Sequence, residues 1–140
     1  MNTTTLGEIG AEYIEMRKHH MNSEEFAELI KDIRDESIDN TYSFFTKPPG
    51  RKPRQRHIEL SNWLNALDDK DKVMLREFIK EGIDSSLFSL FCIIDGARKV
   101  EEGEFKLSYI EEGKEIILNE PGKEDLHDLY NYLIQSEQPE

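Results

Sequence analysis

The sequence predicts a mostly helical α+β protein, with four to five helices and a C-terminal β-hairpin packed on a central helix. Three observations lead to this prediction. Apolar residues recur at helical spacing over most of the chain. The spacing changes to two near residue 105. A last helical stripe then follows Pro121-Gly122. With 140 residues, the chain has the length of one ordinary domain.

Residues 1–45 are expected to form a pair of helices that is an appendage of the same domain. Apolar residues at helical spacing predict the first helix over about residues 6–21. The second should begin at Asn22 or Ser23, either of which can cap it, and end near Asn40. A group of aromatic residues after this helix is expected to tether the chain to the core: Tyr42, Phe44 and Phe45.

A basic segment, residues 46–57, separates these helices from the rest of the chain. Its three prolines and one glycine argue against a regular helix or a central strand. Its five positive charges, which we call the basic arm, belong to Lys47, Arg51, Lys52, Arg54 and Arg56. The whole chain carries −12, so the remainder carries −17 once these five charges are set aside. We expect an exposed linker. Contact with nucleic acid, with the protein's own acidic surface or with an acidic partner stays open.

Residues 58–135 are expected to form the α+β body, with a mobile tail at 136–140. A short helix should end at Asp68-Asp69. A long central helix should run from about Asp69 to Ile94, with Gly96 in a left-handed conformation just after it.

Three further features complete the predicted body. Gly82, in the middle of the central helix, would permit a kink or a close helix contact. Alternating apolar residues predict strands near residues 105–109 and 115–119, joined by a turn. The last helix is expected over about residues 123–134.

The charge and cysteine content restrict the class of partner and the compartment. A net charge of −12 either serves solubility alone or favours basic protein partners, and it disfavours nucleic acid and anionic membranes. The single cysteine, Cys92, lies in an apolar run and cannot form an internal disulfide. Together with an N-terminal sequence unlike a secretory signal, this predicts a cytoplasmic protein. The longest apolar cluster, Leu87 to Ile94, is too short to span a bilayer.

The sequence contains no recognisable catalytic or metal-ligand motif, so we predict no catalytic residue, no metal and no cofactor. Four residues are candidates for a pocket or an interaction: Asp84, Asp95, His127 and Tyr130. Asp84 and Asp95 adjoin apolar residues, where a buried carboxylate can serve acid–base chemistry. Alternatively, Asp84 is exposed and Asp95 only ends a helix. Asp125 and Asp128 flank His127, as a weak divalent-cation site or as a solvated surface.

Part of the chain resembles short bacterial proteins of unknown function. The resemblance lies in WLNALDDKDKVMLREFIKEGIDSSLFSLFCIIDG, followed by a hairpin and EDLHDLYNYL, and it covers about residues 58–135. It implies the order helix, two strands, helix, and no catalytic role. In size and acidity the chain is also similar to bacterial immunity and antitoxin proteins, which implies a protein partner.

Three functions follow from these observations. The first is a non-enzymatic protein whose acidic surface binds a basic protein, as an immunity protein would. The second is an enzyme or small-ligand-binding domain in which the four candidate residues converge. The third is a structural or oligomerising subunit that associates through the helices of residues 6–45.

Overall fold

The computed structural model describes residues 20–137, so most of the helix expected over residues 6–21 lies outside the described residues. Within this range the chain forms four helices and one two-stranded antiparallel sheet. Their order is α2 (Ser23–Thr46), α3 (Gln55–Ala66), α4 (Asp69–Ile94), β1 (Ser108–Glu111), β2 (Lys114–Ile117) and α5 (Leu126–Gln135). The predicted α+β, mostly helical class is confirmed.

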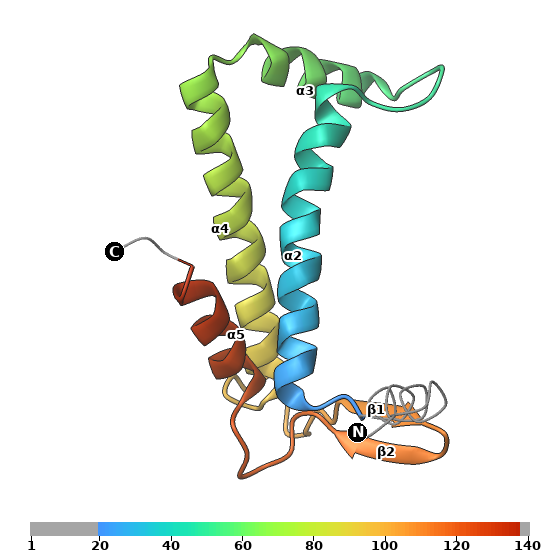
Figure 1. Ribbon diagram of the computed structural model, residues 1–140, viewed down its shortest axis with the longest axis vertical. Coiled ribbons are helices and arrows are strands. Elements are labelled where there is room, and N and C mark those ends of the chain that lie inside the picture. The colour runs from blue at the N-terminus through green and yellow to red at the C-terminus, as the bar shows by residue number, and fades with distance from the viewer. Residues whose placement is uncertain (1–19, 138–140) are drawn as a thin grey trace, which may run out of the picture.

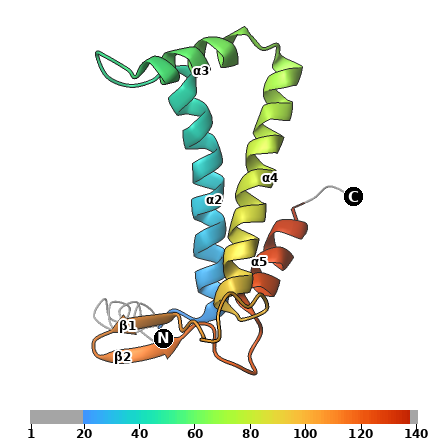
Figure 2. The same cartoon turned by 180° about the vertical axis from the view of Figure 1, so that it is seen from behind.

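The two long helices form an open frame. α2 and α4 lie side by side at one end and diverge toward the other, where α3 crosses between them (Figure 1). The short α5 packs against both long helices near the end where they meet. Seen from behind, α4 lies in front of α5, so α5 covers one side of the pair (Figure 2). Among residues 20–137, no helix has the length and apolar character that crossing a bilayer requires.

α2 begins as the sequence predicts but ends later. The Asn22 side chain accepts a hydrogen bond from the backbone N–H of Glu25 at 2.8 Å, which is the expected cap. The helix continues to Thr46 and does not stop near Asn40. Its last carbonyl, that of Thr46, accepts hydrogen bonds from the Ser61 hydroxyl (3.2 Å) and the Asn65 amide (2.9 Å) of α3. These contacts stabilise the helical turns after Asn40, which no local sequence pattern predicts.

The aromatic residues near the end of α2 therefore lie inside a helix and do not form a separate tether. Phe44 and Phe45 contact the ring of His57 edge to face, with centroids 5.2 and 5.5 Å apart. His57 belongs to α3, which begins at Gln55. The expectation that residues 46–57 exclude a helix was therefore wrong for residues 55–57. The last proline, Pro53, precedes the first turn, so it removes no helical hydrogen bond.

α4 runs from Asp69 to Ile94, as predicted. Asp68 caps it by accepting from the backbone N–H of Asp71 at 2.8 Å. Gly96 follows in the left-handed region, with φ of 77°. Gly82 does not lie at a close helix contact, because a Cβ atom added there would meet nothing within 4 Å.

The hairpin pairs Ser108 with Ile117 and Tyr109 with Ile116, and it turns at Glu112-Gly113. Both turn residues have positive φ (49° and 78°), as a tight two-residue hairpin turn requires. The strands lie beyond the C-terminal end of α4 and project sideways, so they do not cover the side of that helix as expected (Figure 1).

The base of the hairpin accounts for this position. The Asn119 amide donates to the backbone carbonyls of Ile94 (2.8 Å) and Phe105 (2.7 Å), which fastens the hairpin to the end of α4. Ser23 of α2 donates to the Leu118 carbonyl at 2.7 Å. These bonds hold the base of the hairpin at the point where α2 begins and α4 ends.

The core lies where α2, α4 and α5 converge. Phe91, Leu126 and Tyr130 are at most 2% exposed. Partly buried apolar residues surround them: Phe26, Ile30, Leu87, Ile94, Leu107 and Ile134. Because α5 begins at Leu126 and not near residue 123, its apolar face starts directly on this core.

Candidate interaction surface

Asp84 is buried in an ion pair and is not on an exposed side of α4. It is 8% exposed, and Arg34 of α2 is 2% exposed. Arg34 Nε donates to Asp84 Oδ1 at 2.8 Å, and Arg34 Nη2 donates to Asp84 Oδ2 at 2.7 Å. The Tyr130 hydroxyl of α5 donates to Asp84 Oδ1 at 2.7 Å. One carboxylate therefore joins three helices.

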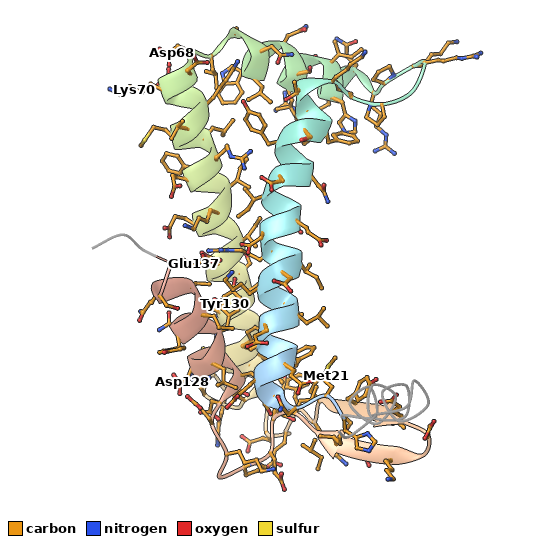
Figure 3. All side chains as sticks on the ribbon, viewed as in Figure 1. Met21, Asp68, Lys70, Asp128, Tyr130 and Glu137 are labelled. Carbon is orange, nitrogen blue, oxygen red and sulfur yellow. The ribbon has the colours of Figure 1, made fainter. Side chains whose placement is uncertain are left out.

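The remaining nitrogen of Arg34 is also occupied. Its Nη1 donates to Asp35 at 2.7 Å and to Glu137 at 2.8 Å. Lys31 contacts the same two carboxylates. Figure 3 shows Tyr130 between the helices with Glu137 near the end of α5. Glu137, which belongs to the tail expected to be mobile, is thus held by ion pairs to Lys31 and Arg34.

The pKa values of Arg34 and Tyr130 are both raised within this cluster. The hydrogen bond from Arg34 to Asp84 raises the pKa of the guanidinium further, despite its burial. Burial, followed by the hydrogen bond to Asp84, raises the pKa of Tyr130 well above its ordinary value. Arg34 therefore stays charged and Tyr130 stays protonated near neutral pH, which suits both groups to holding the helices together.

Asp95 and His127 form a second, separate pair. The Asp95 side chain is 1% exposed, and its Oδ2 lies 2.8 Å from both the backbone N and the ring Nδ1 of His127. The ring of Phe88 meets the His127 ring edge to face, with centroids 5.7 Å apart. Asp95 therefore does more than end α4, because it also caps the N-terminus of α5.

The four candidate residues consequently form two pairs and not one site. Asp84 lies in α4 and Asp95 directly follows its last residue, so the two are eleven residues apart, or about 16 Å along the helix axis. Asp84 contacts Tyr130, and Asp95 contacts His127. Both pairs connect the α4 segment with α5. In each pair, the side-chain polar atoms are engaged in hydrogen bonds between these two segments.

Three residues at the start of α5 could hold a divalent cation. Asp125, His127 and Asp128 each offer one ligand atom, and these atoms lie within 4.8 Å of one another. His127 Nδ1 contacts Asp95, and Nε2 lies 3.5 Å from Asp128 Oδ1. Both aspartates are exposed. These are the residues that the sequence offered as a weak cation site or as a solvated surface.

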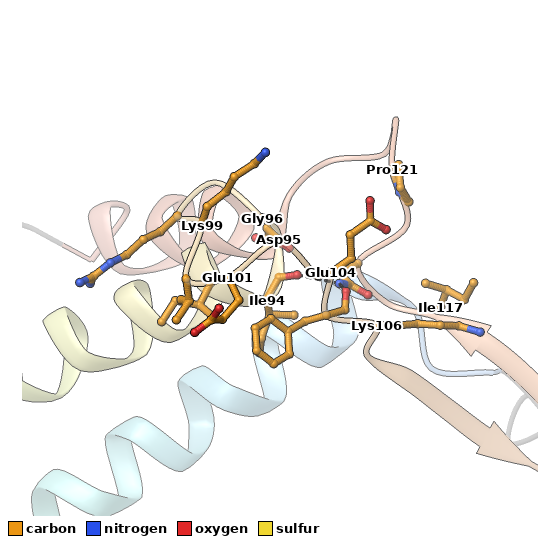
Figure 4. Close-up of a pocket in the computed structure, with 15 residues that line it drawn as sticks. Ile94, Asp95, Gly96, Lys99, Glu101, Glu104, Lys106, Ile117 and Pro121 are labelled. Carbon is orange, nitrogen blue, oxygen red and sulfur yellow. Dashed lines mark hydrogen bonds between the residues drawn. The ribbon is translucent and has the colours of Figure 1, made fainter.

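Among the hollows of the described residues, two lie at opposite ends of the molecule. One, of about 610 Å³, lies between the end of α4, the following loop and the base of the hairpin. Its charged side chains Lys99, Glu104 and Lys106 extend in different directions (Figure 4). The other is an apolar crevice of about 210 Å³ where α2, α3 and α4 diverge. Its lining includes Phe45, Leu64 and Trp63, of which Trp63 is 54% exposed.

A row of exposed carboxylates follows one side of α2. These residues recur every four positions and we call them the acidic ridge: Glu24, Glu28, Asp32 and Glu36. Residues four apart lie one above another on a helix. Two apolar side chains of α2, Leu29 (42% exposed) and Ile33 (48% exposed), adjoin the ridge. The net charge indicated an acidic surface, but it did not show which helix carries that surface.

The basic arm lies at the end of α2 remote from the hairpin. All five of its cationic residues are exposed, and Arg56 contacts Glu59 of α3 at 3.2 Å. The loop projects away from the helices (Figure 1), so the arm does not fold back along α2 in this structure.

Arg34 is the residue of this region that sequence reasoning missed. A signal was present, because Arg34 falls on the same side of α2 as the buried Ala27 and Ile38. An arginine on a buried face requires a partner, which the sequence alone could not identify.

The stability of the Arg34 cluster should depend on acid pH. Burial would raise the pKa values of Asp35 and Glu137, but hydrogen bonds from Arg34 and Lys31 outweigh it and hold both below their usual range. As pH falls below about 4, the unfolded chain takes up protons before the folded one, so the stabilising contribution is lost. We expect the difference in unfolding free energy between wild type and Asp35→Asn/Glu137→Gln to shrink from pH 6 to pH 3 in urea titrations. A constant difference would contradict this assignment.

The structure thus offers two kinds of feature. The buried pairs hold α5 on α2 and α4, and the acidic ridge and its apolar neighbours face outward. No protein-family model, curated protein or solved structure matches the chain.

Proposed function

We propose that this protein is a non-enzymatic binding protein that engages a basic protein partner through the acidic ridge. The observation that supports this is the row of four exposed carboxylates on α2, with Leu29 and Ile33 beside it. Carboxylates in a row attract a basic surface and accelerate association. Apolar side chains beside them give the interface area from which water is excluded.

The distribution of the other ionisable groups agrees with a binding role. Asp84, Asp95 and His127 all have partners within the protein, and these partners come from neighbouring helices. The carboxylates of the acidic ridge lie on the exposed side of α2, where a partner can reach them. The role that we propose is that of a bacterial, cytoplasmic, immunity- or antitoxin-type protein. The small size, the net charge of −12 and the single cysteine support it.

A capture experiment with two matched variants tests this function. The ridge variant is Glu28→Gln/Asp32→Asn/Glu36→Gln, and the control is Glu101→Gln/Glu102→Gln/Glu104→Gln. Each removes three exposed negative charges, so the net charges are equal. Tagged wild type, ridge variant and control are incubated with lysate of the native host at low salt, and captured proteins are quantified by mass spectrometry.

We expect a basic protein in near-stoichiometric amount with wild type and control, and at least about tenfold less with the ridge variant. A tenfold loss corresponds to about 1.4 kcal/mol, which three weakened charge contacts can supply. Equal recovery by all three proteins, or no stoichiometric protein with wild type, would refute the proposed function.

A further inference from the structure

We infer that the basic arm binds the acidic ridge of a second copy of this chain, so that two copies pair with their α2 helices antiparallel. This inference rests on the proposed function, because it uses the same acidic ridge. It states what binds the ridge when no other protein is present. The two surfaces have opposite charge and lie at different ends of one molecule.

The first step is the charge of the two surfaces. The segment of residues 46–57 contains five cationic residues and no acidic one. The acidic ridge offers four carboxylates on one side of α2. Every residue of both sets is exposed, so each surface is accessible to another molecule.

The second step is the limited reach of the arm within its own chain. Both ends of the loop are fixed, because α2 ends at Thr46 and α3 begins at Gln55. Half of an eight-residue loop extends at most about 13 Å. Glu36 lies about 15 Å from Thr46 along the helix, and Glu28 lies about 27 Å away. The arm therefore falls short of most of the ridge on its own helix.

The third step is symmetry. If a second copy lies antiparallel to the first, the arm of each comes beside the far part of the other's ridge, near Glu24 and Glu28. A two-fold axis then produces two identical arm–ridge contacts. The exposed side chains of Leu29 and Ile33 lie near the middle of α2, where the paired helices approach each other.

This pairing should be weak and dependent on salt. Each exposed ion pair contributes about 0–1 kcal/mol, and the Debye length falls from about 10 Å at 0.1 M salt to about 3 Å at 1 M. A second copy bound in this way would cover the ridge until a more strongly basic partner displaces it.

Charge reversal tests the inference directly. The arm-reversed variant is Arg51→Glu/Lys52→Glu/Arg54→Glu, and the ridge-reversed variant is Glu24→Lys/Glu28→Lys/Asp32→Lys. Alone, each variant brings like charges together in both contacts. In a 1:1 mixture both contacts become attractive, because one molecule is negative at both surfaces and the other is positive at both. Analytical ultracentrifugation at low salt, with circular dichroism as a check of folding, measures the result.

We expect wild type to dimerise, each variant alone to be monomeric, and the mixture to form a heterodimer. The dissociation constant of wild type should rise at least about tenfold as salt is raised from 25 to 300 mM. A monomeric wild type at about 200 µM protein, or dimers of either variant alone, would overturn the inference. A monomeric wild type whose ridge variant still loses a captured host protein would overturn the dimer and leave the proposed function standing. If wild type dimerises but the ridge variant captures the same host proteins as wild type, the proposed function is overturned and the dimer stands.

Discussion

Replacing Asp84 with alanine is expected to lower the free energy of unfolding by about 3–5 kcal/mol. The substitution leaves the guanidinium of Arg34, which is 2% exposed, without the carboxylate that accepts two of its hydrogen bonds. It also removes the acceptor of the Tyr130 hydroxyl. A buried charge that loses its partner is among the most destabilising changes in a protein interior. Urea-induced unfolding at pH 7, followed by circular dichroism, measures the change.

Two further variants show whether the cost comes from the unpaired charge. Asp35→Ala removes another carboxylate from the same guanidinium, but its side chain is 43% exposed. We expect it to cost at most about 1 kcal/mol. The double variant Arg34→Met/Asp84→Leu removes both charges and should recover most of the stability lost in Asp84→Ala. A cost of less than 1 kcal/mol for Asp84→Ala would show that the buried pair does not hold the helices together.

Replacing Asp95 with alanine should cost about 2–5 kcal/mol, because two interactions are lost at once. A helix cap contributes about 0.5–2 kcal/mol, and a hydrogen bond to a charged group contributes about 1.5–3 kcal/mol. Asp95 Oδ2 provides both, since it contacts the backbone N and the ring Nδ1 of His127. The loss should be greatest in α5, so hydrogen exchange of its backbone amides should accelerate more than that of α4. Urea unfolding measures the total change.

A second aspartate at the same end of α5 serves as a matched control. Asp125 occupies the N-cap position, yet its side chain makes no capping hydrogen bond. We therefore expect Asp125→Ala to change the unfolding free energy by less than about 0.5 kcal/mol. If Asp125→Ala costs more than Asp95→Ala, the capping role belongs to Asp125 and the assignment to Asp95 is wrong.

The helix α4 illustrates what local patterns determine. Asp68 caps its start, Gly96 follows its end in the left-handed region, and the apolar stripe between them has helical spacing. Each of these signals acts over a few residues, so both ends could be read from the sequence. The start of α2 at Asn22 and the tight turn of the hairpin were predictable for the same reason.

The end of α2 and the partners of Asp84 illustrate the opposite case. α2 extends to Thr46 because α3 provides hydrogen bonds to its last carbonyl from residues 15 and 19 positions away. Arg34 and Asp84 are 50 positions apart, and Asp95 and His127 are 32 positions apart. Periodicity shows which side of a helix faces the core, but it does not show which other helix that side meets.

By itself, the sequence determined the class of the fold, the limits of the central helix, the acidic net charge and the presence of a basic arm. These properties depend on composition and on neighbours within a few residues. Only the tertiary structure decided that the four candidate residues form two separate pairs and that the acidic ridge and the basic arm occupy distant positions. Pairing and placement depend on contacts between residues far apart in the chain, and those contacts exist only once the helices have packed.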